Sequence, residues 1–466
     1  MLKTKLTDKQ IQLLEHIIGI AVILAIAVRY YFAYPYNLDT KDYYQWARCI
    51  NLGMLPYKDF NMLQTPMSAY INALFYKLGD NIFFLYVVPN TIVNFAIIFF
   101  SIKIARLRKS DTKPFFIYLW GISSMIICNA LYNTLGLMLW IINLYIYFDN
   151  KKERKLYKPT LIGFLTGLCF YAKQNIAAYM VAAFGVVFII NWVEEKAKKE
   201  TIAKEAMALW SSFLATVGTG LLIFWYQGNL KEFFEYILFG TSGFTSSYTS
   251  DGLIFKTIGC IVFCLIVVLF VWRITKESEI CIMCSISLFV AFPIFNTTHL
   301  SLSFLFLFIV MSANIDAIKP FFYFLVWEIT SIQSIRFFGC PYFARIEDYA
   351  LDWNKEIIEY LDCKDVSKYH IIDALAGYYS VYYDRYDKYY DLFLEGNFGS
   401  KTSIDVIQET ITAEKESYFI VRTTEYDEET NFTSLSQHIS GAYDYIREHC
   451  IYVENIDENY AVYRIP

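Results

Sequence analysis

The sequence predicts an α-helical membrane protein with many spans, on three observations. Hydrophobic residues make up 56% of the chain, the mean hydropathy is +0.35, and 40 Phe and 39 Tyr contribute to an aromatic content of 19%. The apolar residues come in blocks long enough to cross a hydrocarbon core of about 30 Å, which takes roughly 20 helical residues. Short clusters of Lys and Arg separate many of these blocks, as in the loops of polytopic membrane proteins.

The apolar blocks predict about 11 membrane-spanning helices, counted by the length that a span requires. The candidate segments are 11–33, 82–102, 114–128, 131–148, 159–172, 175–192, 208–227, 253–272, 279–295, 301–314 and 320–337. The first segment is long and lacks a small-residue cleavage site, so we expect a retained helix and not a cleaved signal peptide. Residues 1–337 are therefore expected to form the membrane domain.

The basic residues predict how the chain is oriented, because short loops rich in Lys and Arg stay in the cytoplasm. Such clusters lie before the first span and at 103–113, 151–155, 196–204 and 273–276. With alternating spans, all of them fall on one side. We therefore expect a multi-pass protein of the cell membrane, with its N-terminus in the cytoplasm and with residues 34–81 and 338–466 outside.

The first external loop, residues 34–81, is polar but has helical periodicity. Apolar residues recur at three- and four-residue spacing, at Tyr43, Trp46, Ala47 and Ile50. Gly53 ends this pattern, and Pro66 opens a second amphipathic segment that stops at Gly79. Both segments are too short to span the membrane comfortably, so we expect two interfacial helices around a polar turn.

The C-terminal segment, residues 338–466, differs in composition from the rest of the chain. It is polar and acidic and contributes much of the formal net charge of −5. The short apolar runs HIIDAL, YFIVRT and YAVYRI are typical of strands between helices. We therefore expect a small external α/β domain, and no basic surface suggests a nucleic-acid partner.

The ten cysteines and the other ligand residues do not indicate a metal centre. Cys281 and Cys284 have the spacing of a metal knuckle, but this single pair lies in an apolar helix, where core packing is the expected role. Cys340, Cys363 and Cys450 are expected outside, and a disulfide between two of them is left open. A requirement for a divalent metal is also left open.

Three carboxylates of the first loop, Asp39, Asp42 and Asp59, are expected close to lipid headgroups. An acidic residue at that depth can act as a general base on a substrate that arrives from the bilayer, since partial desolvation raises its pKa. The alternative is that these carboxylates only solvate the loop. Spacing alone favours this alternative.

The order of residues in the loop resembles a known family. Asp39, Tyr43 and Ala47 stand at four-residue spacing, followed by Gly53, Pro56-Tyr57-Lys58-Asp59-Phe60, Pro66, Tyr70 and Gly79. This pattern resembles the first external loop of the GT-C membrane glycosyltransferases, in particular family 39-like bacterial members related to protein mannosyltransferases and to the lipid A aminoarabinose transferase. The many spans and the external C-terminal domain are also similar to that family.

The resemblance implies a GT-C-like fold and an inverting transfer of a sugar from a polyprenyl-phosphate donor to a cell-envelope acceptor, which is a glycan, a lipid or a protein. By this resemblance Asp39 is the general base on the acceptor hydroxyl. Asp42 and Asp59 are secondary candidates that bind the acceptor or orient the loop. Tyr57 and Gln64, which stand within the motif, are candidate substrate-binding residues.

The sequence also departs from the family pattern at two places. Thr40 replaces the acidic residue that usually follows the first Asp, so the resemblance does not extend to a paired carboxylate or a metal site there. Gln64-Thr65-Pro66-Met67 stands where the aminoarabinose transferases carry Glu-Lys-Pro-Pro, so the lysine expected at the lipid phosphate is missing. Another cation has to take its place.

Lys173 is the best substitute for that lysine, because a charge between two apolar segments is costly unless it serves a function or reaches the interface. Topology puts Lys173 and Gln174 at the outer ends of two spans. The alternative role for Lys173 is an interfacial anchor, and Arg48 and Lys58 compete for the phosphate. His299 lies at another external hairpin, where it either contacts the phosphate or acceptor or is simply solvated.

Other functions remain as alternatives. Charged residues among many helices also suit a transporter or a lipid flippase, although no repeated halves are evident. A polysaccharide polymerase or ligase would use the same kind of donor. Soluble-enzyme signatures such as a Gly-rich phosphate loop, a His-Glu-x-x-His helix or a Gly-x-Ser-x-Gly elbow do not occur in the sequence. The identities of the sugar and the acceptor do not follow from the sequence.

Overall fold

The protein is mostly helical and contains one small sheet. The computed structural model describes residues 8–33, 39–81, 83–110, 112, 114–127, 130–194, 197–241, 251–291, 297–314, 350–364, 366, 368–372, 398–423 and 433–466. The chain divides into two compact units. The first contains Met1–Tyr34, Asn81–Leu221 and Ser250–Phe343, and the second contains Pro35–Asp80, Leu222–Thr249 and Ala344–Pro466.

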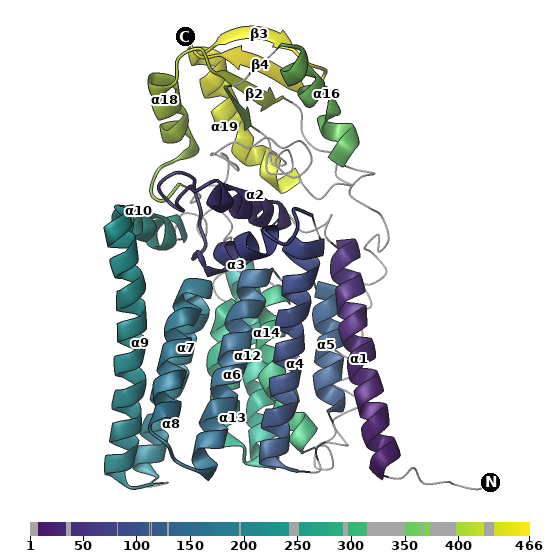
Figure 1. Ribbon diagram of the computed structural model, residues 1–466, viewed down its shortest axis with the longest axis vertical. Coiled ribbons are helices and arrows are strands. Elements are labelled where there is room, and N and C mark those ends of the chain that lie inside the picture. The colour runs from purple at the N-terminus through teal and green to yellow at the C-terminus, as the bar shows by residue number, and fades with distance from the viewer. Residues whose placement is uncertain are drawn as a thin grey trace, which may run out of the picture. The chain divides into compact units, whose positions relative to one another are not determined.

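The first unit consists of apolar helices that run back and forth along a common direction (Figure 1). Helix α6 packs side by side with both α4 and α7, and α5 packs on α1 and α14. The helices are α1 (Asp8–Ala33), η2 (Phe83–Val87), α4 (Val88–Arg108), α5 (Phe115–Ile127), α6 (Leu131–Lys152), α7 (Tyr157–Ala172), α8 (Gln174–Val193), α9 (Lys199–Gln227), α12 (Asp251–Thr275), α13 (Ser278–Ser287), η4 (Leu288–Ala291) and α14 (Thr297–Ala313). The last turns of α9 belong to the second unit.

Within the described part of the chain, six helices are long and apolar enough to cross a membrane. They are Lys9–Tyr31, Phe83–Arg108, Leu131–Lys152, Gln174–Val193, Lys199–Gln227 and Ile254–Thr275. The prediction of a helical, membrane-embedded protein is confirmed at this level. The apolar helices α5, α7, α13 and α14 are shorter, and the predicted span at 320–337 lies outside the described residues. A total of eleven spans therefore stays a prediction.

Two glycines let α7 approach α9 closely. A Cβ atom on Gly163 would lie 2.1 Å from the backbone oxygen of Leu209, and one on Gly167 would lie 2.5 Å from Cβ of Thr216. The two glycines are four residues apart and share one face of α7. Small residues at this spacing let membrane helices pack backbone to backbone. Van der Waals contacts then stabilise the pair, because the hydrophobic effect does not favour helix association within lipid.

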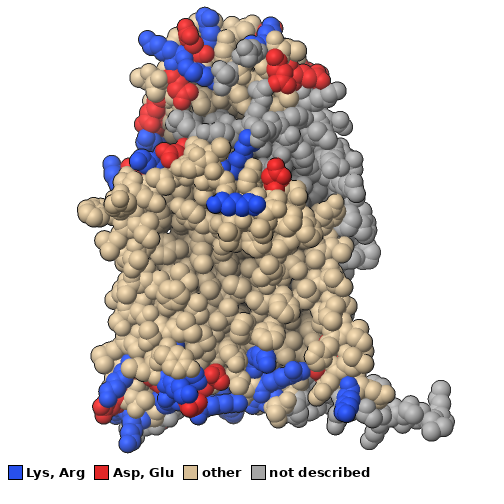
Figure 2. All heavy atoms as spheres, viewed as in Figure 1, with Lys and Arg blue, Asp and Glu red and all other residues tan. Residues whose placement is uncertain are grey.

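Charged residues gather at one end of the helices of the first unit. Ion pairs join Arg106 to Glu15 at 2.9 Å, Arg154 to Glu205 at 3.0 Å and Lys158 to Asp149 at 2.8 Å, and others join Arg108 to Glu277 and Lys151 to Glu279. Figure 2 shows Lys, Arg, Asp and Glu residues gathered along the lower edge of a wide surface without charged residues. The arrangement agrees with the predicted grouping of the basic clusters on one side. Which side faces the cytoplasm stays a prediction.

The second unit contains the two helices predicted in the first loop, α2 (Asp39–Asn51) and α3 (Met67–Tyr76). Trp46 and Ala47 are buried on α2, as their spacing predicted. Gly53 ends the α2 region with a φ of +86°, which favours glycine. The amide of Asn51 donates to the backbone oxygen of Ala73 at 2.9 Å and so ties α2 to α3. With 10 residues, α3 is too short to span a membrane.

The second unit also contains a mixed four-stranded sheet. The apolar runs predicted as strands form β1 (Tyr369–Ile372), β2 (Tyr418–Arg422) and β4 (Tyr460–Arg464), and β3 (Ile451–Asn455) completes the order β1-β2-β4-β3. Strand β1 pairs parallel to β2, with Tyr369 opposite Tyr418, whereas β4 is antiparallel to both β2 and β3. Helices α16 (Ala350–Cys363), α18 (Ser403–Ala413) and α19 (Thr433–His449) accompany the sheet.

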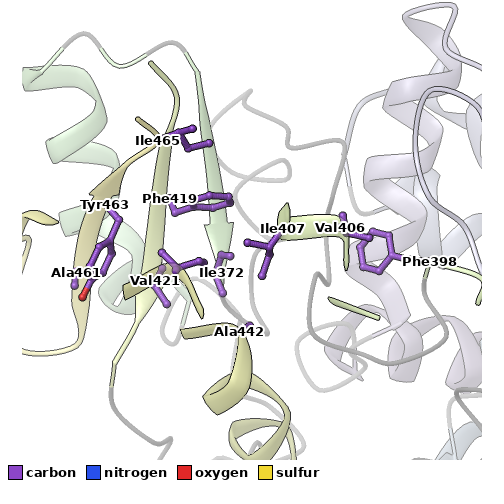
Figure 3. Packing of buried hydrophobic residues seen from close by; sticks show 11 residues of the cluster. Ile372, Phe398, Val406, Ile407, Phe419, Val421, Ala442, Ala461, Tyr463 and Ile465 are labelled. Carbon is purple, nitrogen blue, oxygen red and sulfur yellow. The ribbon is translucent and has the colours of Figure 1, made fainter. Parts of the chain in front are cut away.

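Successive side chains of a strand point to opposite faces of the sheet, and β1, β2 and β4 bury side chains on both faces, whereas β3 is largely exposed. Phe419 and Val421 of β2 pack with residues of α18 and α19 on one face (Figure 3). Ile420 lies on the other face, with Ile357 and Leu361 of α16. A strand that is buried on both faces needs apolar side chains at successive positions. The sequences of β1, β2 and β4 are therefore nearly continuous apolar runs. The predicted boundary at 337/338 lies outside the described residues.

Candidate functional site

The proposed base stands at the start of helix α2. The helix begins at Asp39, after the five residues that follow α1, and Asp42 lies one turn further along it. The side chains of Asp39 and Asp42 lie outside what the structure describes, so their contacts stay predictions. Arg48, in the last turn of α2, is half-buried, and Lys58 in the following turn is exposed.

Asp59 closes the turn formed by residues 55–60. Its Oδ2 accepts a hydrogen bond from the backbone N–H of Leu55 at 2.7 Å, and its own N–H donates to the oxygen of Leu55 at 2.9 Å. The N–H of Tyr57 donates to the oxygen of Phe60 at 2.9 Å. Of the two secondary roles predicted for Asp59, these contacts support orientation of the loop.

Tyr57 holds the 55–60 turn against a distant segment of the second unit. It has a φ of +69°, which is uncommon for a large residue, and its side chain is 3% exposed. Its ring lies 5.4 Å from that of Phe233 and 5.9 Å from those of Phe224 and Tyr236, measured between centroids. Aromatic pairs at such distances stabilise a fold beyond simple burial. Tyr57 is thus buried in an aromatic cluster, and its predicted role in substrate binding stays a prediction.

The hydroxyl of Tyr57 is also occupied, since it donates to the backbone oxygen of Gln64 at 2.7 Å. Burial, and to a smaller degree the charge of Tyr70, raises the pKa of Tyr57 well above its usual value. The residue therefore remains a neutral hydrogen-bond donor over the physiological range. This bond fixes the main chain at Gln64, eight residues before Asn72 in α3.

The 222–241 segment contributes contacts that sequence reasoning missed. After the end of α9, the amide of Asn229 donates to the backbone oxygen of Pro56 at 2.9 Å, and Asn229 is fully buried. Helix α10 (Leu230–Phe234) and the π-helical η3 (Glu235–Gly240) follow. Glu235 accepts hydrogen bonds from the backbone N–H of Ser400, at 3.3 Å, and from its hydroxyl. The segment thus joins the first loop to the part of the second unit that carries the sheet.

Buried polar atoms without partners form a second feature of the first loop. Thr65, Ser68 and Asn72 have no exposed surface, and within the described residues neither their hydroxyls nor the Asn72 amide has a hydrogen-bond partner. Oε1 of Gln64 is in the same state. We call these four residues the α3 polar stripe. Leaving a buried polar group unpaired costs about 1–3 kcal/mol, so such groups are rare without a reason.

Lys173 occupies the break between α7 and α8. Its φ of −159° and ψ of 101° are extended, while its N–H donates to the oxygen of Cys169 at 2.7 Å and its oxygen accepts from Ala177 at 3.1 Å. The ammonium nitrogen lies 4.2 Å from the centroid of the Tyr132 ring, a favourable cation–π position. A Cβ on Gly136 would lie 3.3 Å from Cβ of Lys173, so the lysine stem packs tightly on α6.

His299 lies in the first turn of α14, and the positive charge of Lys173 acts on its ring. Nδ1 of His299 is buried and has no hydrogen-bond partner in the described parts of the chain, and the same holds for Oδ1 of the buried Asn133. Gln174 is half-buried next to Lys173. The first unit thus brings together two predicted residues, Lys173 and His299, that are far apart in the sequence.

The described residues contain no group of three or more His, Cys, Asp and Glu side chains that could hold a metal ion. Cys281 and Cys284 are buried in α13, and the thiol of Cys284 lies 3.5 Å from the backbone oxygen of Ser303. These contacts are those of core packing. Cys363 and Cys450 are free cysteines, and Cys340 lies outside the described residues.

No protein-family model matches the chain, and no curated protein matches it. The resemblance to GT-C enzymes therefore depends on the ordered loop motif at residues 39–79 of the sequence and stays a prediction. The two units offer different chemical groups to a ligand. The first has a cation beside a histidine, which suits an anionic group, and the second has neutral polar groups in a helical loop.

Proposed function

We propose that this protein is an integral membrane glycosyltransferase that moves a sugar from a polyprenyl-phosphate donor to a cell-envelope acceptor on the outer face of the membrane. The observation that carries this proposal is the position of Lys173, a cation at the junction of two apolar helices, over Tyr132 and near His299. Intramembrane or interfacial charges of this kind are expensive and usually functional. A lipid-linked phosphate is the ligand that such a cation would meet there.

In the proposed reaction, the oxygen of an acceptor hydroxyl forms a bond to the anomeric carbon of the donor sugar. The bond from that carbon to the phosphate oxygen breaks at the same time, and its electron pair leaves with the phosphate. Asp39 takes the proton of the hydroxyl, as the loop motif implies. Attack opposite to the leaving group inverts the anomeric configuration.

Lys173 would offset the negative charge that grows on the departing phosphate. A positioned cation stabilises the transition state more than the ground state when charge develops during the reaction. His299, whose Nδ1 has no partner among the described residues, would supply a hydrogen bond to the same phosphate or to the acceptor. In this proposal Arg48 and Lys58 remain alternative cations.

A transporter or lipid flippase is the main alternative from another class, and a polysaccharide polymerase or ligase is an alternative within the same donor class. A flippase would bind the lipid-linked sugar but leave its glycosidic bond intact. A polymerase or ligase would transfer a preassembled glycan in preference to a single sugar. Product analysis separates these three outcomes.

The deciding experiment offers the purified protein a panel of radiolabelled polyprenyl-phosphate sugars together with envelope extracts as acceptors. We expect transfer of one sugar, and in Lys173→Ala an apparent donor affinity lower by about 10- to 100-fold, because a hydrogen bond to a charged group contributes about 1.5–3 kcal/mol. Lys173→Arg should retain part of the affinity, since the charge persists with another geometry.

Lys204→Ala is the matched control, because Lys204 is an exposed lysine that pairs with Glu200 at the charged end of α9. It should leave the donor dependence unchanged. Equal donor affinity in the wild type and Lys173→Ala would assign Lys173 to anchoring. Donor that is bound but never cleaved, with any acceptor in the panel, would favour the flippase.

A further inference from the structure

We propose that the α3 polar stripe, formed by Gln64, Thr65, Ser68 and Asn72, binds the hydroxyl groups of an uncharged sugar ring. This inference rests on the proposed function and deepens it, because it names the chemical class that one part of the site receives. Its basis is a contrast between Asn72 and the other asparagines of this chain.

Five other buried asparagines of the described helices each donate a hydrogen bond from Nδ2. Asn90 and Asn94 donate to the carbonyl oxygen four residues earlier, at 2.8 Å, and Asn143, Asn150 and Asn191 donate to a side chain of another helix, at 2.8–3.1 Å. Asn72 is equally buried in α3, yet neither atom of its amide has a partner within the described residues. The backbone carbonyl of Ser68 lies four residues before Asn72 in α3, but Nδ2 of Asn72 does not donate to it.

Ser68 and Asn72 lie on one face of α3, and Gln64 and Thr65 immediately precede the helix. Ser68 and Asn72 are four residues apart in α3, and Thr65 precedes Ser68 by three. The Tyr57 hydroxyl fixes the main chain of Gln64, and the bond from Asn51 to Ala73 fixes the far side of α3 on α2. The main chain is therefore held on both sides of the stripe, while Oε1 of Gln64, the two hydroxyls and the Asn72 amide have no hydrogen-bond partner among the described residues.

The chemistry of the stripe selects the ligand. Two hydroxyls and two amides offer several donors and acceptors, and none of these four side chains carries a charge. A phosphate or carboxylate would find no cation among them, whereas adjacent hydroxyls of a sugar ring both donate and accept. The spacing of one helical turn suits a ring with several hydroxyls better than a single water molecule.

Oε1 of Gln64, the hydroxyls of Thr65 and Ser68 and both amide atoms of Asn72 have no exposed surface, so a sugar reaches these atoms only when their covering shifts. In this structure, which we call the closed arrangement, the covered polar groups have no partner among the described residues. Their burial therefore stabilises the closed arrangement less than burial of paired groups would. A bound sugar restores those hydrogen bonds and favours the open arrangement by its differential affinity. The same unpaired groups that weaken the closed state would thus supply binding.

The test uses thermal unfolding of the purified full-length protein in detergent, with methyl glycosides of uncharged hexoses as probes. Wild type should gain thermal stability with at least one glycoside at millimolar concentration. Asn72→Leu should match or exceed the wild-type midpoint without sugar, since an apolar side chain replaces unpaired polar atoms, while its affinity for the glycoside falls about tenfold or more. Ser68→Ala should act in the same direction with a smaller effect.

Asn51→Leu is the control, because it removes an amide that has two partners and should lower the midpoint without sugar. The proposal is overturned if Asn72→Leu and Ser68→Ala lower the midpoint as Asn51→Leu does, if the glycoside response is intact in both, or if no glycoside stabilises the wild type. Inorganic phosphate should stabilise Asn72→Leu as it does the wild type. Failure of phosphate to bind, with the glycoside response intact, would count against the proposed function and not against the stripe.

Discussion

The 55–60 turn and the α3 polar stripe lie within one loop but treat their polar groups in opposite ways. In the turn, the Asp59 carboxylate, the Tyr57 hydroxyl and the Pro56 carbonyl each have a hydrogen-bond partner. In the stripe, the polar side-chain atoms of Ser68 and Asn72 have none among the described residues. Tyr57 is buried, as are Ser68 and Asn72, so exposure to water does not explain the difference between these residues.

The contrast separates residues that build the loop from residues that are still available to a ligand. A group whose hydrogen bonds are all internal contributes to stability and is costly to redirect. A buried group without a partner reduces stability, and proteins keep such features mainly where function requires them. The family motif in the sequence covers both regions and does not distinguish these two roles.

We expect the largest effect, on turnover, when Asp39 and Asp59 of the loop motif are each replaced by asparagine. Asp39→Asn keeps the size of the side chain but removes the proposed general base, so turnover should fall about 100- to 10,000-fold. Asp59→Asn should cost little, because an amide oxygen can still accept the hydrogen bond from the Leu55 N–H. The measurement is the transfer rate of each variant beside a donor-binding assay.

Donor binding and thermal midpoint should be unchanged in Asp39→Asn, which distinguishes a lost base from a damaged loop. Transfer by Asp39→Asn within a few-fold of wild type would place the base elsewhere. A collapse of turnover in Asp59→Asn, with its stability intact, would instead assign Asp59 a role in the reaction and not only in the structure of the loop.

The next effect concerns the fully partnered turn. Tyr57→Ala removes a buried ring from contact with Phe224, Phe233 and Tyr236 and should cost about 3–5 kcal/mol, the usual cost of truncating a buried aromatic side chain to alanine. Tyr57→Phe keeps the ring and loses only the bond to Gln64, at about 0.5–1.5 kcal/mol. Thermal midpoints in detergent give the order of the two variants.

Tyr57 also predicts a pH dependence. Burial raises its pKa well above the usual value of about 10, so its stabilisation is fully present below pH 10 and is lost as the pH rises through the folded-state pKa. Tyr57→Phe should lack this alkaline loss. Equal midpoints of wild type, Tyr57→Phe and Tyr57→Ala would show that the aromatic cluster does not hold the turn.

The smallest effect is expected where the 222–241 segment meets the turn at Phe398–Ser400. Glu235→Ala removes hydrogen bonds that Ser400 donates at a partly exposed site, and such bonds contribute about 0.5–1.5 kcal/mol. Gly399→Ala should destabilise this contact more than Glu235→Ala does. Gly399 has a φ of +71°, and an added Cβ would lie 2.7 Å from Cγ of Glu235. Limited proteolysis of the C-terminal region should report both changes, with Gly399→Ala cleaved faster. Cleavage of both at the wild-type rate would contradict the contact.

Local sequence pattern alone determined much of the architecture. Apolar runs of sufficient length predicted the membrane helices, the three- and four-residue spacing at Trp46 and Ala47 predicted α2, and Gly53 and Pro66 marked the breaks around the turn. The runs at 369–372, 418–422 and 460–464 predicted three strands. These features depend on neighbours within a few residues, where periodicity and turn chemistry dominate.

The roles of the motif residues depended on contacts that no local pattern encodes. The motif did not show that Tyr57 packs against rings more than 150 residues away in the sequence. The charge of Lys173 acts on His299 only because the two residues belong to the same compact unit. The availability of Asn72 is likewise invisible in the sequence, since an asparagine in a helix reads the same whether or not its amide is paired. Pairing across long sequence separations is a property of the tertiary structure, and it decides which polar groups are used by the fold and which are left for a ligand.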